Sequence, residues 1–238
     1  MWAWAQEQRQ RTQRLKQDWR ATEWLAVDLE TNGLDADANG ILSMAWVALN
    51  SKGIRLASAD YHVIWSEQPL NQSVIHHGLT EQDIARGETL AAVMPLFAQA
   101  LEGRILVAHH AAFDWQLLQQ AAQLTDVDLN PLAVLDTLQL ERSRQQARYQ
   151  QLHCQGSAMG AYTLAACRRP YALPDKPQHH ALEDAMACAE LFLVQAWQIG
   201  GQQPLSAGQL VRRSRRPLRL PLVPLGAKKA EATTNKVV

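Results

Sequence analysis

WLAVDLE (residues 24–30) is a short apolar run that ends in carboxylates, and the turn sequence TNG (31–33) follows it directly. A nearly continuous apolar run of this length is typical of a strand buried in the centre of a sheet. Asp28 and Glu30 lie two residues apart, so on a strand their side chains point to the same face. The stretch therefore predicts a central strand that carries two acids near its end.

Further strand signals follow along the chain. ILSMAWVAL (41–49) and IRLASADYHVIW (54–65) flank the turn sequence NSKG (50–53), a pattern typical of a hairpin. The compact apolar segments RILVA (104–108) and LAVLD (132–136) come later, and a helical pattern follows each of them. Three antiparallel strands followed by strand–helix–strand–helix predict an α/β fold in which helices flank a mixed sheet.

Helices are expected where apolar residues recur at helical spacing, as Leu90, Val93, Phe97 and Leu101 do. The expected helices run over 2–20, 81–86, 89–101, 111–124, 138–148, 161–168 and 181–198, with a loop over 150–160.

The composition is that of an ordinary globular protein. Apolar residues make up 47% of the 238 residues, charged residues make up 19%, and the formal net charge is zero. No stretch approaches about eighteen apolar residues and the N-terminal segment lacks an apolar signal core, so neither a membrane span nor a secretory signal is expected. The three cysteines form no CxxC pair, which favours reduced thiols in a cytoplasmic protein.

Charge is segregated along the chain. Residues 1–20 have a net charge of +3 and residues 201–238 a net charge of +7, whereas residues 21–200 have a net charge of −10. Either the acidic groups bind divalent cations, which invert the local field, or they form a solvated acidic surface. The Pro- and Arg-rich segment over 201–238 shows no convincing periodicity, and we expect it to be a flexible tail.

Four acids and a histidine lie where strands end or helices begin. Asp28 and Glu30 stand on the central strand, and Asp114 follows an apolar strand in the first turn of a helix. Asp184 lies in the first turn of the last long helix, and His179 precedes it by five residues. Each acid alone has a plainer interpretation, since surface acid pairs and acids that compensate a helix dipole are common.

Together these residues stand in three motifs, VDLETNGL (27–34), VAHHAAFDWQLL (107–118) and HHALEDAMA (179–187). The motifs resemble those of the DnaQ-like, or DEDDh, exonucleases, a family that includes the epsilon proofreading subunit of the replicative polymerase, ribonuclease T and oligoribonuclease. The resemblance covers roughly residues 23–198. It implies a ribonuclease H-like fold and a 3′→5′ exonuclease activity.

Four carboxylates in one site repel one another, and they stay ionised only if cations neutralise them. Oxygen ligands select hard ions such as Mg²⁺ or Mn²⁺, and two ions about 3.5–4 Å apart would hold the attacking and leaving oxygens of a phosphodiester displacement. By resemblance, Asp28 would bridge both ions. Glu30 and Asp184 would serve the ion on the side of the nucleophile, and Asp114 would serve the other. His179 is the candidate general base, because histidine titrates near the working pH.

The same resemblance implies contacts with the substrate. Thr31 would help to seat the 3′-hydroxyl. Leu34 would pack near the terminal base, with an ordinary loop anchor as the alternative. His110 takes the place of the family's usual Asn in the second motif and is expected on the substrate side, which leaves the positioning of that loop open.

Three regions are expected: an N-terminal helical extension over 1–20, an exonuclease domain over 21–200, and the basic tail over 201–238. The tail either attracts phosphate without sequence preference, or is simply solvated, or docks through PLRLPLVPLG (217–226) on a polymerase or repair partner.

The expected function is a metal-dependent 3′→5′ exonuclease that acts on the free 3′ end of single-stranded or frayed DNA. The same chemistry on RNA or short oligoribonucleotides is an open alternative, because the sequence does not identify a reader of the 2′-hydroxyl. A non-catalytic binding module is the alternative from another class. The complete set of four acids and one histidine argues against that module.

Overall fold

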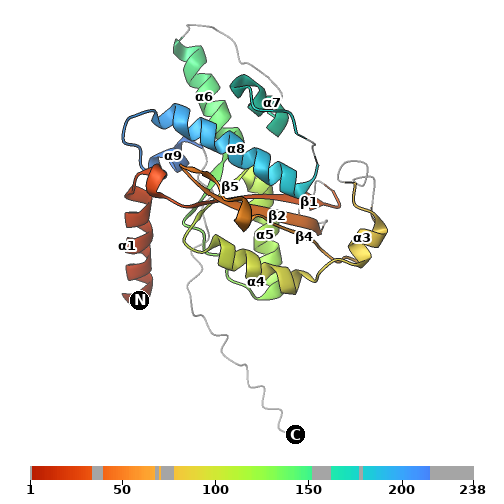
Figure 1. The fold of residues 1–238 in the computed structure, drawn as a ribbon. Coiled ribbons are helices and arrows are strands. Elements are labelled where there is room, and N and C mark those ends of the chain that lie inside the picture. Colours follow the sequence, from red (N-terminus) through yellow and green to blue (C-terminus); the bar gives the residue numbers. More distant parts are fainter. Residues whose placement is uncertain are drawn as a thin grey trace.

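The chain folds around one six-stranded sheet (Figure 1). The computed structural model describes residues 2–33, 40–67, 70, 78–151, 162–176 and 179–214. The strands are β1 (Trp24–Thr31), β2 (Ile41–Asn50), β3 (Gly53–Ile54), β4 (Asp60–Val63), β5 (Ile105–Ala108) and β6 (Ala133–Asp136). Their order is β3-β2-β1-β5-β6, and β4 also pairs with β2.

The sheet is mixed, as the sequence predicts. β1 pairs antiparallel with β2, and β2 pairs antiparallel with both β3 and β4. β1 pairs in parallel with β5, and β5 pairs in parallel with β6. The strand that carries Asp28 and Glu30 is therefore central, with antiparallel strands on one side and parallel strands on the other. This arrangement confirms the expected α/β fold class.

Helices occupy the connections and both ends of the described chain. The helices are α1 (Trp2–Lys16), α3 (Glu81–Ala85), α4 (Leu90–Leu101), α5 (Ala111–Thr125), α6 (Thr137–Gln151), α7 (Leu164–Arg168), α8 (Ala181–Gly200) and α9 (Ala207–Arg213). Three short 3₁₀ turns are η1 (Trp19–Ala21), η2 (Leu56–Ser58) and η3 (Arg169–Tyr171). Among the described residues, no helix is long and apolar enough to span a membrane.

Helices α1 and α6 end differently from the sequence prediction. α1 ends at Lys16, before the expected residue 20, because the side chain of Asp18 caps the separate turn η1. α6 continues to Gln151, into the segment expected to be a loop. The rest of that expected loop, 152–160, lies outside the described residues.

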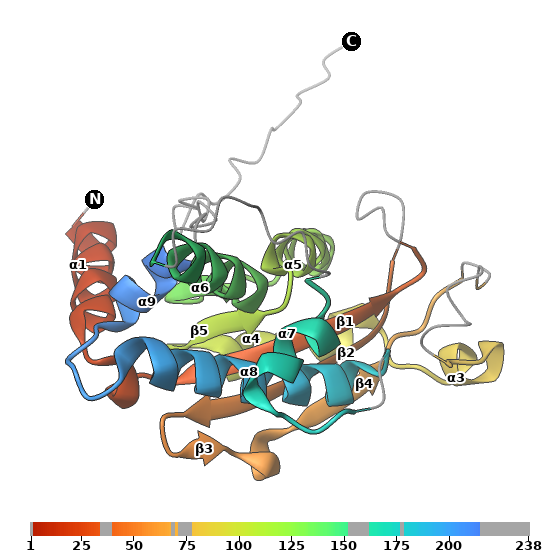
Figure 2. The same cartoon turned by 90° about the horizontal axis from the view of Figure 1, so that it is seen from above.

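Helices cover both faces of the sheet (Figure 2). Alternate residues of β1 face opposite cores: Leu25 and Val27 pack with α4 and α5, whereas Trp24 packs with α8. Asp28 and Glu30 lie at even positions of the strand, as Trp24 does, so they face α8. Because side chains alternate along the strand, a third acid can reach Asp28 and Glu30 from α8.

The segment 54–65, expected to be one strand of a hairpin, is divided in two. β3 pairs with the end of β2 and β4 pairs with its middle, while η2 lies between them. The hydroxyl of Ser58 accepts a hydrogen bond from the N–H of Ala48 at 2.9 Å, where a regular ladder would use a carbonyl. The prediction of a single strand was wrong because a side chain from the turn replaces a backbone partner.

The chain beyond residue 201 is ordered further than the sequence predicts. α9 buries Leu210 and Val211 in the core that packs against α8. The expectation of a flexible tail was therefore wrong over 205–213. Residues 215–238 lie outside the described residues, and the expected roles of that part of the tail stay predictions.

The two terminal helices also contact each other. The N–H of Ala207 donates to the carbonyl of Gln17 at 2.9 Å. A Cβ placed on Gly208 would stand 2.9 Å from the backbone oxygen of Leu15, so only glycine allows this close approach of α9 to α1. The expected N-terminal extension is thus joined to the C-terminal segment.

Candidate active site

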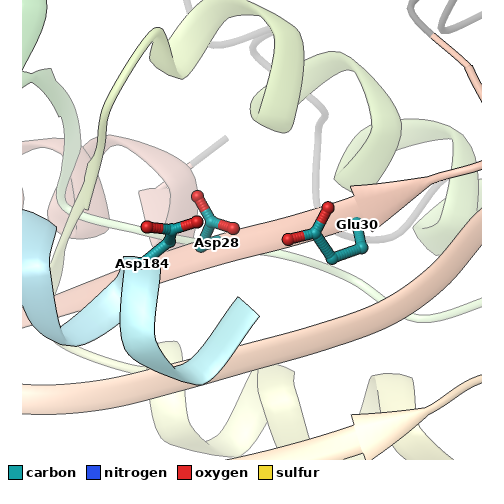
Figure 3. Close-up of side chains that lie close together, drawn as sticks. All are labelled: Asp28, Glu30 and Asp184. Carbon is teal, nitrogen blue, oxygen red and sulfur yellow. The ribbon is translucent and has the colours of Figure 1, made fainter. Parts of the chain in front are cut away.

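Three carboxylates converge between β1 and α8. One oxygen of each of Asp28, Glu30 and Asp184 lies within 4.8 Å of the other two. The three side chains lie side by side in Figure 3, two of them from β1 and one from the first turn of α8. The structure thus brings together three of the four acids that the sequence singled out, and we call them the acid cluster.

Small residues allow α8 to approach the sheet at this point. Ala181 and Ala185 of α8 are buried and pack with Ala45 of β2. Ala45 is the partner of Asp28 across the β1–β2 ladder, so larger side chains here would push the first turn of α8 away from that acid. Asp184 lies in the first turn of α8, where the helix dipole favours negative charge.

The acid cluster is poorly solvated. Burial raises the pKa of Asp28 well above its usual value, and the charges of the neighbouring acids, Asp114 first, raise it further. Burial and then the charge of Asp184 raise the pKa of Glu30 to about 7, and burial also raises the pKa of Asp184. A site of this kind favours a positive charge. Its three oxygen donors match the preference of hard divalent cations, so these residues fit Mg²⁺ or Mn²⁺.

Asp114 lies beside the acid cluster. Among the described residues it is not one of the three acids in mutual contact range. Its side chain is 6% exposed in the first turn of α5, and burial followed by the charge of Asp136 raises its pKa to about 8. Because the charge of Asp114 also raises the pKa of Asp28, this fourth acid acts on the cluster electrostatically.

The turn before α5 explains the histidine at position 110. His110 has a left-handed backbone with φ 73° and ψ 42°, a conformation that Asn, Asp and His tolerate better than other residues with a Cβ. Its N–H donates to Oδ1 of Asp136 at 3.1 Å. His110 therefore meets a backbone requirement that Asn would also meet. Its exposed side chain stands at the end of α5 that carries Asp114.

His179 precedes Asp184 by five residues and is hydrogen-bonded to this acid of the cluster. It is exposed, with a left-handed backbone of φ 66°, and its N–H donates to Oδ2 of Asp184 at 2.7 Å. The next residue, His180, stacks on Tyr61 of β4 with ring centroids 4.7 Å apart. The segment that carries the candidate base is thus attached both to an acid of the cluster and to the antiparallel side of the sheet.

The chain leaves the central strand at the expected substrate-binding residues. The register of β1 against β2 shifts between Glu30 and Thr31. Thr31 is half-buried, and its hydroxyl donates to the carbonyl of Gly33 at 2.5 Å. Leu34 lies outside the described residues, so its contact with a terminal base stays a prediction.

Two residues beside the site were not assigned a role from the sequence. Asp136 caps α6 by accepting the N–H of Leu138 at 2.9 Å, and an acid directly before a helical pattern could have indicated this. Tyr61 faces α8 because it is paired with Ala45 across β2 and β4. Its stacking on His180 depends on tertiary packing, which the spacing along the chain does not reveal.

Comparison with known proteins decides the family. A family model named RNase_T and described as an exonuclease matches residues 25–192, a span that includes all four acids and His179. The chain belongs to this exonuclease family. The resemblance to DnaQ-like exonucleases that the three motifs indicate is thereby confirmed.

Relatives of the chain include a protein named as DNA polymerase III subunit epsilon-like and one named ribonuclease T. A DNA polymerase III subunit epsilon-like protein of Rhodobacter capsulatus is 31% identical over 174 residues, which are 71% of this chain and 23% of that protein. Ribonuclease T of Buchnera aphidicola is 27% identical over 204 residues, which are 76% of this chain and 88% of that protein. Several relatives are much longer, since the chain spans 28%, 11% and 23% of the length of three curated proteins it matches.

A solved exonuclease has the same fold. The structure of Exonuclease X in complex with 5′ overhanging duplex DNA aligns with a TM-score of 0.57 and 21% sequence identity, covering 80% of this chain and 99% of that chain. The alignment confirms the ribonuclease H-like arrangement of a mixed sheet between helices.

Proposed function

We propose that this chain is a metal-dependent exonuclease that removes nucleoside monophosphates one at a time from the 3′ end of single-stranded or frayed DNA. The observation that carries the proposal is the convergence of Asp28, Glu30 and Asp184 within 4.8 Å. Crowded and poorly solvated carboxylates destabilise a fold unless cations neutralise them, so a structural role alone does not account for the cluster. Membership of an exonuclease family supports a hydrolytic use.

Asp28, Glu30 and Asp184 would hold a divalent cation such as Mg²⁺ or Mn²⁺, and Asp114 would contribute to a second. Bound there, the cations would neutralise the acids and stabilise the negative charge that develops on a phosphodiester during in-line displacement. The raised pKa values of Asp28 and Glu30 support this role, since cations would replace the protons that these groups otherwise bind.

His179 is the proposed general base. Its exposed imidazole would accept a proton from the attacking water. The hydrogen bond from its N–H to Asp184 supports the assignment, because it keeps the backbone of His179 beside the acid cluster.

Three residues are proposed to contact the end of the substrate. Thr31 would accept a hydrogen bond from the 3′-hydroxyl, because its own proton is donated to Gly33. Leu34 would pack against the terminal base. His110 would contact the strand beside Asp114, since its exposed side chain stands at that end of α5.

DNA is proposed as the substrate because Exonuclease X, which has the same fold, was solved with DNA bound. RNA is the competing substrate, because the chain covers 88% of a relative named ribonuclease T. A polymerase or repair protein is the proposed partner, supported by the relative named as epsilon-like, with residues 217–226 as the proposed contact.

Digestion of single-stranded DNA and RNA of the same sequence, labelled at the 5′ end, tests this function. With Mg²⁺ or Mn²⁺ we expect a ladder that shortens from the 3′ end, faster on DNA, and no digestion in EDTA. A substrate with a blocked 3′ end is the control and should stay intact. Immediate release of the labelled 5′ nucleotide would contradict the polarity, and faster digestion of RNA would reassign the substrate.

A further inference from the structure

A buried guanidinium connects α8 to the segment that precedes His179. Arg168, the last residue of α7, has a side chain that is 4% exposed. It donates to the backbone carbonyls of Ala187 at 2.7 Å and Pro174 at 2.9 Å, and to Oε2 of Glu190 at 2.7 Å. Because burial of this charge is costly unless its donors are paired, the contacts hold the backbone at Pro174 against α8.

Glu190 extends this network to a second anchor. Its other oxygen, Oε1, lies 3.0 Å from Nζ of Lys176, which is also 3.9 Å from an oxygen of Glu183. The side chains of Lys176 and Glu190 are 21% and 27% exposed, so solvent screens this ion pair only in part. α8 therefore holds the chain at two points, at Pro174 through Arg168 and at Lys176 through Glu190.

The second anchor lies close to His179 along the chain. His179 follows Lys176 by three positions, and even a fully extended chain over three residue steps spans at most about 11 Å. On its other side, His179 is attached to Asp184 through its backbone N–H. The left-handed backbone of His179 is one that His tolerates but that is still less favourable than the right-handed region, so contacts outside the residue help to maintain it.

We propose that Arg168, Glu190 and Lys176 form a clamp that positions the imidazole of His179 beside the acid cluster. These three residues act on His179 only through the chain between Pro174 and α8, so they are positioning residues rather than catalytic ones. The inference rests on the proposed role of His179 as general base. The charge network beside α8 would thus contribute to catalysis by positioning His179.

Substitutions of Lys176 and of Glu190, whose side chains are both partly exposed, test the clamp. Lys176→Met removes one anchor without leaving a buried charge, and Glu190→Gln removes the charge that both cations share, whereas loss of Arg168 itself could unfold the protein. We expect each variant to lower kcat about tenfold with KM unchanged, because a small misplacement of a catalytic group is costly. Glu102→Gln, at the exposed end of α4, is the matched control for loss of one negative charge and should keep the kcat of the wild type.

Combination with His179→Ala separates positioning from general stability. If the clamp acts through His179, Lys176→Met should change kcat less than twofold once the imidazole is absent. A tenfold loss in both backgrounds would overturn the proposal. Unchanged kcat in folded Lys176→Met and Glu190→Gln would overturn it as well.

A spectroscopic readout keeps the clamp testable apart from the enzyme activity. In protein with ¹³C-labelled histidine, the ring signal of His179 is assigned by its loss in His179→Ala. We expect Lys176→Met and Glu190→Gln to shift or broaden that signal. An unchanged signal in both variants would contradict the clamp, whereas an inactive wild type whose His179 signal responds would contradict the proposed function and retain the clamp.

Discussion

Two histidines beside the acid cluster have left-handed backbones, His110 with φ 73° and His179 with φ 66°. At both positions the backbone N–H donates to a carboxylate, Asp136 in the first case and Asp184 in the second. The spacing of the motifs predicted that these residues lie near the acids. It did not predict their conformations, because φ depends on hydrogen bonds to residues far along the chain or in the next element.

Substitution of His110 tests whether the left-handed backbone conformation determines which residues this position accepts. We expect His110→Asn to change the free energy of unfolding by less than about 0.5 kcal/mol, because Asn tolerates the left-handed region. His110→Val should cost about 1–3 kcal/mol, because a β-branched residue is strained there. Urea unfolding of the three proteins measures both values. Equal stability of the Asn and Val variants would contradict the conformational explanation.

At the scale of helices and strands, patterns within one element were predictable and contacts between elements were not. The apolar runs located β1, β2, β5 and β6, and helical periodicity located α4, α5 and α8. The short helix α9 was missed because seven residues with little periodicity are stable only through tertiary packing. The capping box formed by Ser206 and Gln209 was the available signal for its start.

In the site, too, patterns within one element were predictable and contacts between elements were not. Strand alternation predicted that Asp28 and Glu30 share a face, and the start of a helix predicted the place of Asp184. The clamp was not predictable, because it depends on how α7 packs against α8. The place of Asp114 outside the acid cluster was not predictable either, because it depends on how α5 packs against the sheet.

The close approach of α9 to α1 gives a prediction for these two helices. Gly208→Val should destabilise the protein by about 1–3 kcal/mol, because a Cβ there meets the backbone oxygen of Leu15 and the helices must separate. Gly40→Val is the matched control, since nothing lies within 4 Å of a Cβ at Gly40. Thermal unfolding of both variants measures the difference. A Gly208→Val variant as stable as the control would show that the two helices do not need this contact.

In the part of the molecule that the structure describes, the basic side chains of α9 and the acid cluster lie at opposite ends of β1. α9 contacts η1, which precedes the start of β1, whereas the acid cluster lies toward the end of that strand. The exposed Arg212 and Arg213 of α9 therefore do not neutralise the acids. This separation leaves a poorly solvated negative site that a divalent cation can stabilise.

The metal-free protein should lose stability as the pH rises. Glu30 binds its proton more tightly when folded, with a pKa of about 7 against 4.5 for an ordinary Glu. The resulting stabilisation is fully present below about pH 4.5 and is lost as the pH passes through 7. Above pH 8 we expect Glu30→Gln to be more stable than the wild type by at most about 3 kcal/mol, and the two to converge near pH 4. Chemical unfolding in EDTA measures the difference, and a difference independent of pH would contradict the raised pKa.

The most direct test of the acid cluster is the rate at which wild type and Asp28→Asn release mononucleotides from single-stranded DNA in saturating Mg²⁺. The substitution keeps the size of the side chain and removes its charge, so the metal-free variant should be folded and at least as stable as the wild type. We predict that its rate falls at least about 100-fold, because charge stabilisation by a bound cation is worth several kcal/mol. A folded Asp28→Asn protein that releases nucleotides at nearly the wild-type rate would contradict the assignment of this cluster as the catalytic centre.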